Sequence, residues 1–115
     1  MVMYSIIETE QFIQWLGSLK DRTTRARLQL RLRKASLGNL GDHKSVGDNV
    51  WEMREVFGPG WRMYYILHGS TVIMMLGGGN KSSQKKDIER AKALAQELRN
   101  EQDQDPSVCC IKLPQ

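Results

Sequence analysis

The stretch Gly58-Pro59-Gly60-Trp61-Arg62-Met63-Tyr64-Tyr65 constrains the fold of this chain more than any other. Pro59 presets φ for the second position of a tight turn, and Gly60 allows the positive φ that a type II turn needs next. A strand-like run follows, in which Arg62 and Tyr64 are two residues apart and share one face. Such a pair can bind a phosphate and transfer protons, although an ordinary half-exposed strand has the same pattern.

Two further strand-like runs, residues 50–57 and 71–76, flank this stretch. His68-Gly69 or Gly69-Ser70 predicts a two-residue hairpin turn after residues 61–68, which sets even positions of that run opposite odd positions of the next. The face predicted to be apolar and to form the core holds Trp61, Met63, Tyr65, Leu67, Val72, Met74 and Leu76. The face predicted to be open holds Arg62, Tyr64, Ile66, Thr71, Ile73 and Met75.

The run 50–57 extends this assignment of faces. If Trp51 and Met53 point to the core, Glu52 and Arg54 lie on the open face beside Arg62. That arrangement requires an odd-length connection, or a bulge, through residues 57–60.

Helical periodicity predicts three helices. The apolar stripes are Phe12, Trp15, Leu16 and Leu19; then Leu28, Leu32 and Ala35; and finally Ile88, Ala91, Leu94, Ala95 and Leu98. The first helix begins at Thr9 or Glu10 and ends at Lys20-Asp21. The second runs from Thr23 or Thr24 to about Leu37; residues 28–33 also alternate like a strand, but helix propensity favours the helix. The third has Ser82 or Ser83 as its N-cap and ends near Asn100.

The remaining segments complete the prediction. Residues 2–7 form a short first strand, residues 38–49 form a loop, and Gly77-Gly78-Gly79 leaves the sheet. A length of 115 residues indicates one domain, residues 1–100, and residues 101–115 form a flexible C-terminal tail.

Composition narrows the function classes. The formal net charge is +4, with basic clusters at residues 20–34 and 81–92, which favours a polyanionic partner or a solvated helix face. Cys109 and Cys110 are adjacent and far from His43 and His68, so we expect no metal. The sequence shows no membrane span and no signal peptide, so we expect a cytoplasmic protein.

The candidate chemistry is cationic and phenolic. Lys44 precedes the sheet, Arg62 and Tyr64 lie on its open face, and Lys81 follows its last strand. These four are the candidates for catalysis, and Arg54, Gln84, Lys85 and Lys86 are the candidates for RNA binding. Such a set suits RNA cleavage by attack of the 2′-hydroxyl on the adjacent phosphorus, because cations stabilise the developing charge. It suits passive binding of RNA or DNA equally well.

Several motifs together resemble a known family. They are residues 12–16, 37–47 and 51–54, then Gly58–Tyr65, and the tandem of residues 76–84 with Asp87-Ile88-Glu89-Arg90-Ala91. Over roughly residues 3–99 the order is similar to the RelE/ParE superfamily of toxins from type II toxin–antitoxin modules. It is most similar to the HigB-like, phage "addiction module killer" branch.

The resemblance implies an α+β fold, in which a helical hairpin packs on a twisted antiparallel sheet with a C-terminal helix. It implies a toxin that is neutralised by a cognate antitoxin protein and that acts as a metal-independent, ribosome-dependent mRNA endoribonuclease, without a small-molecule cofactor. Arg62 and Lys81 match the basic active-site positions, and Lys44 matches a loop position. Residues 81–100 lack the tyrosine that some ribonuclease members carry there, and also lack histidine, so either Tyr64 takes the role of the base or acid–base catalysis is weak. ParE-type members inhibit DNA gyrase without cutting RNA, and an inactive antitoxin-binding remnant is the third alternative.

Overall fold

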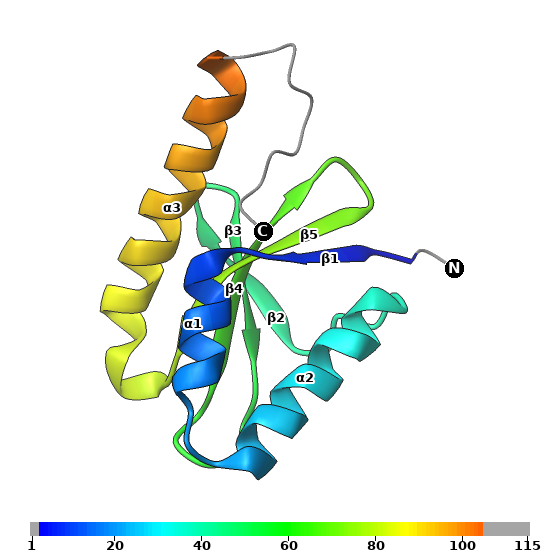
Figure 1. Ribbon diagram of the computed structural model, residues 1–115, viewed down its shortest axis with the longest axis vertical. Coiled ribbons are helices and arrows are strands. Elements are labelled where there is room, and N and C mark those ends of the chain that lie inside the picture. The colour runs from blue at the N-terminus through cyan, green and yellow to red at the C-terminus, as the bar shows by residue number, and fades with distance from the viewer. Residues whose placement is uncertain (1–2, 105–115) are drawn as a thin grey trace.

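Five strands form one mixed sheet in the order β1-β5-β4-β3-β2, with helices on both of its faces (Figure 1). The computed structural model describes residues 3–104. Its elements are β1 (Ser5–Glu8), α1 (Glu10–Ser18), α2 (Arg22–Ser36), β2 (His43–Gly47), β3 (Val50–Arg54), β4 (Arg62–His68), β5 (Val72–Gly79), a 3-10 turn, η1 (Lys81–Ser83), and α3 (Gln84–Gln104). The α+β fold is confirmed. The sheet, predicted to be antiparallel, is mixed because β1 pairs parallel to β5.

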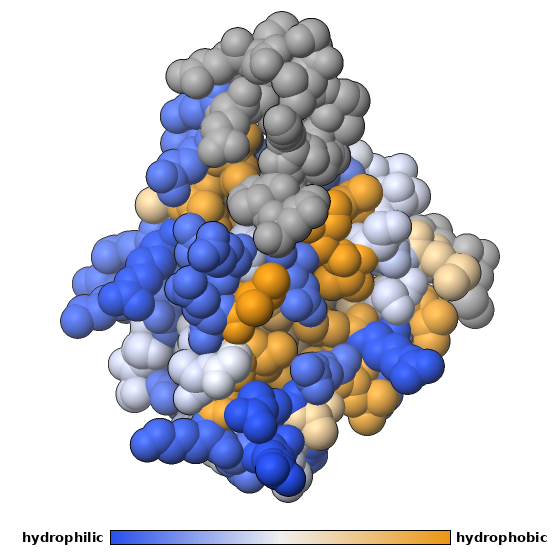
Figure 2. All heavy atoms as spheres, viewed as in Figure 1, coloured by the Kyte–Doolittle hydropathy of each residue, from blue (hydrophilic) through white to orange (hydrophobic). Residues whose placement is uncertain are grey.

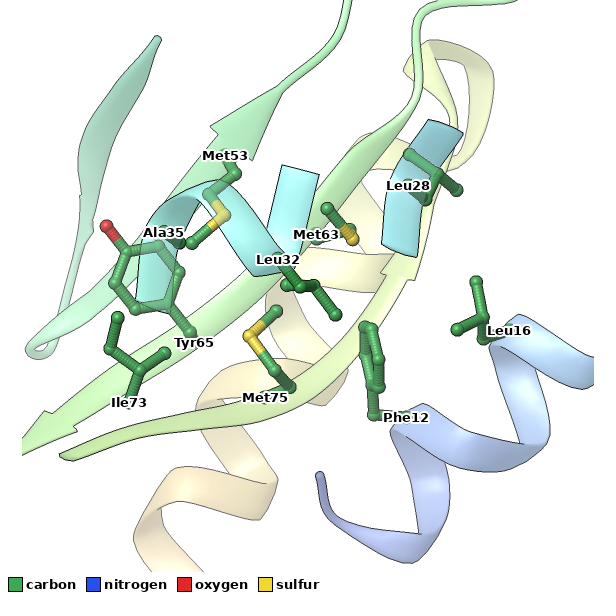
Figure 3. Close-up of a cluster of buried hydrophobic side chains, with 10 residues drawn as sticks. All are labelled: Phe12, Leu16, Leu28, Leu32, Ala35, Met53, Met63, Tyr65, Ile73 and Met75. Carbon is green, nitrogen blue, oxygen red and sulfur yellow. The ribbon is translucent and has the colours of Figure 1, made fainter. Parts of the chain in front are cut away.

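The helical hairpin covers one face of the sheet. From a short connection α1 and α2 diverge as a V (Figure 1). The stripes predicted from helical spacing point inward and meet side chains of β3, β4 and β5 (Figure 3). The buried cluster comprises Phe12, Leu16, Leu28, Leu32, Ala35, Met53, Met63, Tyr65, Ile73 and Met75.

Helix α3 covers the opposite face, which was predicted to be open. A second buried cluster there comprises Val50, Tyr64, Ile66, Met74, Leu76, Ala91, Leu94, Ala95 and Leu98. The apolar run Val72–Leu76 fits this arrangement, because a strand buried on both faces carries apolar residues at every position. The outward side of α3 is hydrophilic (Figure 2).

The predicted hairpin register is wrong by one residue. His68 pairs with Val72, so three residues rather than two form the turn, and its first, Gly69, has φ +68°. Ile73 and Met75 therefore share a face with Tyr65, whereas Met74 and Leu76 face α3. One slipped residue exchanges the two faces of a strand.

The connection between β3 and β4 confirms the predicted odd length. Arg54 pairs with Arg62, Glu52 pairs with Tyr64, and seven residues, 55–61, lie between the two strands. The turn differs in detail, because the Gly60 N–H donates to the Phe57 carbonyl. Gly58 (φ +57°) therefore precedes Pro59 inside the turn, and Gly60 (φ +82°) closes it.

Two predicted loops belong to the sheet. His43–Gly47, placed in a loop by the sequence, is the edge strand β2, antiparallel to β3. Gly77–Gly79 does not leave the sheet, because these residues pair with Tyr64, Met63 and Arg62 of β4. Asn80, rather than a serine, then caps η1 by accepting hydrogen bonds from the N–H groups of Ser82 and Ser83.

The helix boundaries are close to those predicted. Thr9 caps α1, as predicted, and Asp21 caps α2, two or three residues before the predicted Thr23 or Thr24. Helix α3 ends at Gln104, beyond the predicted Asn100, and Cys109 and Cys110 lie outside the described residues. Within residues 3–104 no helix has the length and hydropathy of a membrane span, and no group of three or more potential metal ligands occurs.

Candidate functional site

A cleft of about 500 Å³ lies beside the turn between β3 and β4. Its lining residues are Arg54, Glu55, Val56, Gly58, Pro59, Gly60, Arg62 and Lys81. Three of the predicted site residues, Arg54, Arg62 and Lys81, thus meet in one hollow although they come from three elements. Three cations around exposed backbone can attract an anion such as a phosphodiester.

The turn and η1 are packed together, which places Lys81 in the cleft. The Lys81 N–H donates to the Pro59 carbonyl at 3.4 Å. A Cβ on Gly60 would lie 3.4 Å from the Lys81 Cβ and 3.8 Å from the Arg62 Nη1. Both distances are ordinary van der Waals contacts, so it is the positive φ of +82°, rather than a lack of space, that favours glycine at this position.

The cations differ in how firmly they are held. Arg54 donates to the exposed carboxylate of Asp42 at 3.0 Å, and this hydrogen bond holds the pKa of Asp42 below its ordinary 3.8. Arg62 is largely buried, and its Nε lies 3.7 Å from Oε2 of the wholly buried Glu52. Lys81 is exposed and makes no salt bridge with any side chain that the structure describes.

The sequence interpretation missed the structural role of Arg31. This buried side chain donates to the carbonyls of Arg54, Leu40 and Asp42 and pairs with Glu55, so it fixes the rim of the cleft to α2. The sequence did indicate that Arg31 points inward, because residue 31 lies three positions after Leu28 and falls on the apolar stripe of its helix. Arg31 is therefore not part of a solvated basic face.

Tyr64 is not on an open face. It is wholly buried beneath α3 and does not line the cleft. Burial raises the pKa of its hydroxyl well above the ordinary 10.0, and the neighbouring Glu52 carboxylate raises it further. The hydroxyl makes no hydrogen bond with the described part of the chain. A phenol in these surroundings stays protonated at neutral pH.

The remaining predicted residues lie outside the cleft lining. Lys44 is exposed on β2, opposite Glu52, and Lys85 and Lys86 are exposed in the first turn of α3. The side chain of Gln84 makes an internal hydrogen bond, because its Nε2 donates to Oε2 of Glu52 at 2.8 Å. Glu52 was expected on an open face, and its burial beside Arg62 is visible only in the fold.

A larger hollow of about 550 Å³ lies between α1 and α3, over Trp15, Leu76 and Leu94. Its charged residues, Asp87, Arg90 and Glu97, are of mixed sign. It therefore lacks the concentration of positive charge that marks the cleft at the turn.

Comparison with known proteins adds one sequence relative and three structures. No family model matches the chain. An uncharacterized protein from Haemophilus influenzae is 42% identical over 90 residues, which cover 78% of this chain and 91% of that protein.

The solved structures share the fold. A mutant of the Escherichia coli toxin RelE in the free state superposes with TM-score 0.63 at 17% identity, over 81% of this chain and 98% of that one. Structures of the Mycobacterium tuberculosis RelBE2 and E. coli RelBE toxin–antitoxin complexes both give TM-score 0.56, at 19% and 18% identity. They cover 70% and 67% of this chain, and 100% and 95% of the matched chains. The fold of this chain is the RelE fold.

Proposed function

We propose that this chain, which belongs to the same family as the Haemophilus influenzae protein and has the RelE fold, is the toxin of a type II toxin–antitoxin module. Its proposed activity is metal-independent cleavage of mRNA on the ribosome, as in the HigB-like branch, in the cytoplasm. The observation that supports this proposal most is the convergence of Arg54, Arg62 and Lys81 in the cleft at the turn.

The proposed reaction uses the 2′-hydroxyl of the RNA as the nucleophile. Its oxygen attacks the adjacent phosphorus and gives its proton to water, the bond to the 5′-oxygen of the next nucleotide breaks, and a 2′,3′-cyclic phosphate forms. The departing 5′-oxygen takes a proton from water. Arg62 and Lys81 stabilise the negative charge that develops on the phosphoryl oxygens, and Arg54 binds a neighbouring phosphate. Tyr64 is a poor base because its raised pKa keeps it protonated, so charge stabilisation and positioning carry the proposed catalysis.

Lys44, Lys85 and Lys86 have a supporting role in this proposal. They are exposed and outside the cleft lining, so they suit contacts with more distant phosphates of the RNA. Such contacts add affinity without acting on the reacting atoms.

Growth arrest on induction tests the role of the cleft. Arg62→Ala and Lys81→Ala should each relieve the arrest, whereas Lys92→Ala, which removes a cation paired with Asp48 outside the cleft, should not. Circular dichroism and thermal unfolding establish that each variant folds. Full toxicity of both cleft variants would contradict the assignment.

A second candidate function follows from the composition of the cleft. Neither a histidine nor a tyrosine is among its lining residues, and its only carboxylate, Glu55, is paired with Arg31. This favours, as the alternative, a toxin that binds and inhibits a protein such as DNA gyrase without cutting RNA. Intact mRNA together with a supercoiling defect in arrested cells would support that alternative.

The proposed partner is a cognate antitoxin whose acidic or amphipathic segment covers the cleft. Masking of Arg62 and Lys81 by carboxylates would inhibit either activity through charge complementarity. Co-expression with the cognate antitoxin should restore growth, and the complex should survive size-exclusion chromatography.

A further inference from the structure

We infer that Glu52 is a positioning residue for Arg62, and that Gln84 in turn holds Glu52. The inference rests on the proposed function only in assigning Arg62 to the reaction. The juxtaposition of a wholly buried carboxylate and a largely buried guanidinium behind the cleft is independent of that function.

The contacts define the direction of the Arg62 side chain. Its Nε lies 3.7 Å from Oε2 of Glu52, while its Nη1 would lie 3.8 Å from a Cβ placed on Gly60. One side of the guanidinium therefore faces the buried carboxylate, and the other faces the turn that borders the cleft. The β3–β4 register is consistent with this contact. Glu52 lies opposite Tyr64 and Arg54 lies opposite Arg62, so Glu52 and Arg62 are diagonal neighbours on one face of the sheet.

Anion affinity does not explain the presence of Glu52. A carboxylate beside Arg62 lowers the positive potential of the cleft and weakens its attraction for a phosphate. Burial of the carboxylate also carries a desolvation penalty that an apolar residue would avoid. What the pair supplies is a restricted position, since the planar guanidinium is largely buried next to a carboxylate that is itself held in place.

Gln84 gives this arrangement a second anchor. Its Nε2 donates to the same Oε2 atom at 2.8 Å, and Gln84 is the first residue of α3. The start of α3 thereby fixes the carboxylate, and the carboxylate fixes Arg62. Nε of Arg62 has no hydrogen-bond partner among the described residues, so its contact with Glu52 is an ion pair at 3.7 Å rather than a hydrogen bond.

A positioning role predicts a split between binding and turnover. Glu52→Gln keeps the shape of the side chain and retains an oxygen for Gln84, but removes the charge that directs Arg62. Affinity for phosphate should stay the same or become tighter, because the cleft gains net positive charge. Turnover should fall by about 10- to 100-fold, because a misplacement of about 1 Å can reduce rates by two orders of magnitude.

Two measurements on the full chain test the inference. The first is single-turnover cleavage of a ribosome-bound mRNA, with kcat and KM determined separately. The second is the ¹H–¹⁵N signal of the Arg62 Nε–H, recorded during titration with inorganic phosphate. Asp48→Asn is the control variant, since it removes a carboxylate from an exposed pair with Lys92 that does not line the cleft. Gln84→Ala is the second test variant and covers the case in which Glu52→Gln does not fold.

The expected result is a changed Arg62 Nε–H signal and a fall in kcat at unchanged or lower KM for Glu52→Gln. Gln84→Ala should change both in the same direction but less, and Asp48→Asn should change neither. An Arg62 signal that is identical in folded Glu52→Gln or Gln84→Ala and in the wild type overturns the inference, as does an unchanged kcat with active wild type. If the wild type cleaves no RNA, the proposed function fails, and the Arg62 signal alone decides on positioning.

Discussion

The three consecutive glycines of β5 provide a graded test of the structure. Each would be replaced by alanine in turn. A Cβ on Gly77 meets no atom within 4 Å, whereas a Cβ on Gly78 lies 2.5 Å from two carbons of the Trp15 ring. A Cβ on Gly79 lies 1.8 Å from Oδ2 of Asp87 and 2.9 Å from Oγ of Ser83. The expected loss of stability is therefore largest for Gly79→Ala, smaller for Gly78→Ala and smallest for Gly77→Ala.

The contacts set the magnitudes. Gly77→Ala should be neutral or stabilise the protein by up to about 1 kcal/mol, because alanine restricts the unfolded chain more than glycine does. Gly78→Ala should destabilise it by about 1–3 kcal/mol, the usual range for overpacking. Gly79→Ala must also displace Asp87, which accepts a hydrogen bond from Ser83, and adds about 1 kcal/mol for that bond.

Urea unfolding and thermal unfolding measure these differences. A loss of 2 kcal/mol lowers the Tm by roughly 8 °C in a domain of this size. Equal stability of the three variants to within about 0.5 kcal/mol would refute the packing of Trp15 and Asp87 against β5. A Gly77→Ala variant that is the least stable of the three would refute it as well.

Three further predictions concern stability and charge. Arg31→Met should lower the free energy of unfolding by about 3 kcal/mol, since it leaves Glu55 and three carbonyls without their donor, and a urea midpoint close to that of exposed Arg33→Met would contradict this. Burial raises the pKa of Tyr65 from 10.0 to about 12. The contribution of Tyr65 to stability is therefore present below pH 10 and is lost between pH 10 and 12, because the unfolded state ionises first. Absorbance titration at high pH checks this, and ionisation of every tyrosine near pH 10 in the folded protein would oppose it. Arg54→Ala should reduce the salt dependence of RNA binding by about one unit of slope, and an unchanged slope would remove Arg54 from the phosphate contacts.

Local patterns in the sequence predicted much of the fold. The apolar stripes of the three helices match the buried side chains, because helical spacing alone decides which side chains share a face. The odd connection between β3 and β4 was also predictable, because Trp51 and Met53 had to join Met63 in the core.

Long-range strand pairing was harder to predict from the sequence. The hairpin turn after His68 contains three residues, and no local signal separates this from the two-residue turn. The edge strand His43–Gly47 consists largely of polar and exposed residues, and its strand structure comes from hydrogen bonds to β3. The open face disappeared because α3 packs on it, although the apolar run of β5 indicated burial on both sides.

The candidate site was predicted only in part, again because long-range packing decides where its residues lie. Arg54, Arg62 and Lys81 meet as the sequence order and the turn required. The burial of Tyr64, the contact of Gln84 with Glu52 and the structural role of Arg31 depend on α2 and α3, which approach from outside the sheet. Sequence patterns identify the charge of a residue, whereas packing decides whether it faces solvent or the interior.

We propose that the cleft of Arg54, Arg62 and Lys81 cleaves translated mRNA. Mapping of mRNA 5′ ends after induction tests it most directly, with the wild type and folded Arg62→Ala produced at equal levels. The proposal predicts new 5′ ends within translated coding regions for the wild type, and their absence for Arg62→Ala and in cells with ribosome binding blocked. Growth arrest with an unaltered set of 5′ ends, or the same new ends with Arg62→Ala, would contradict it.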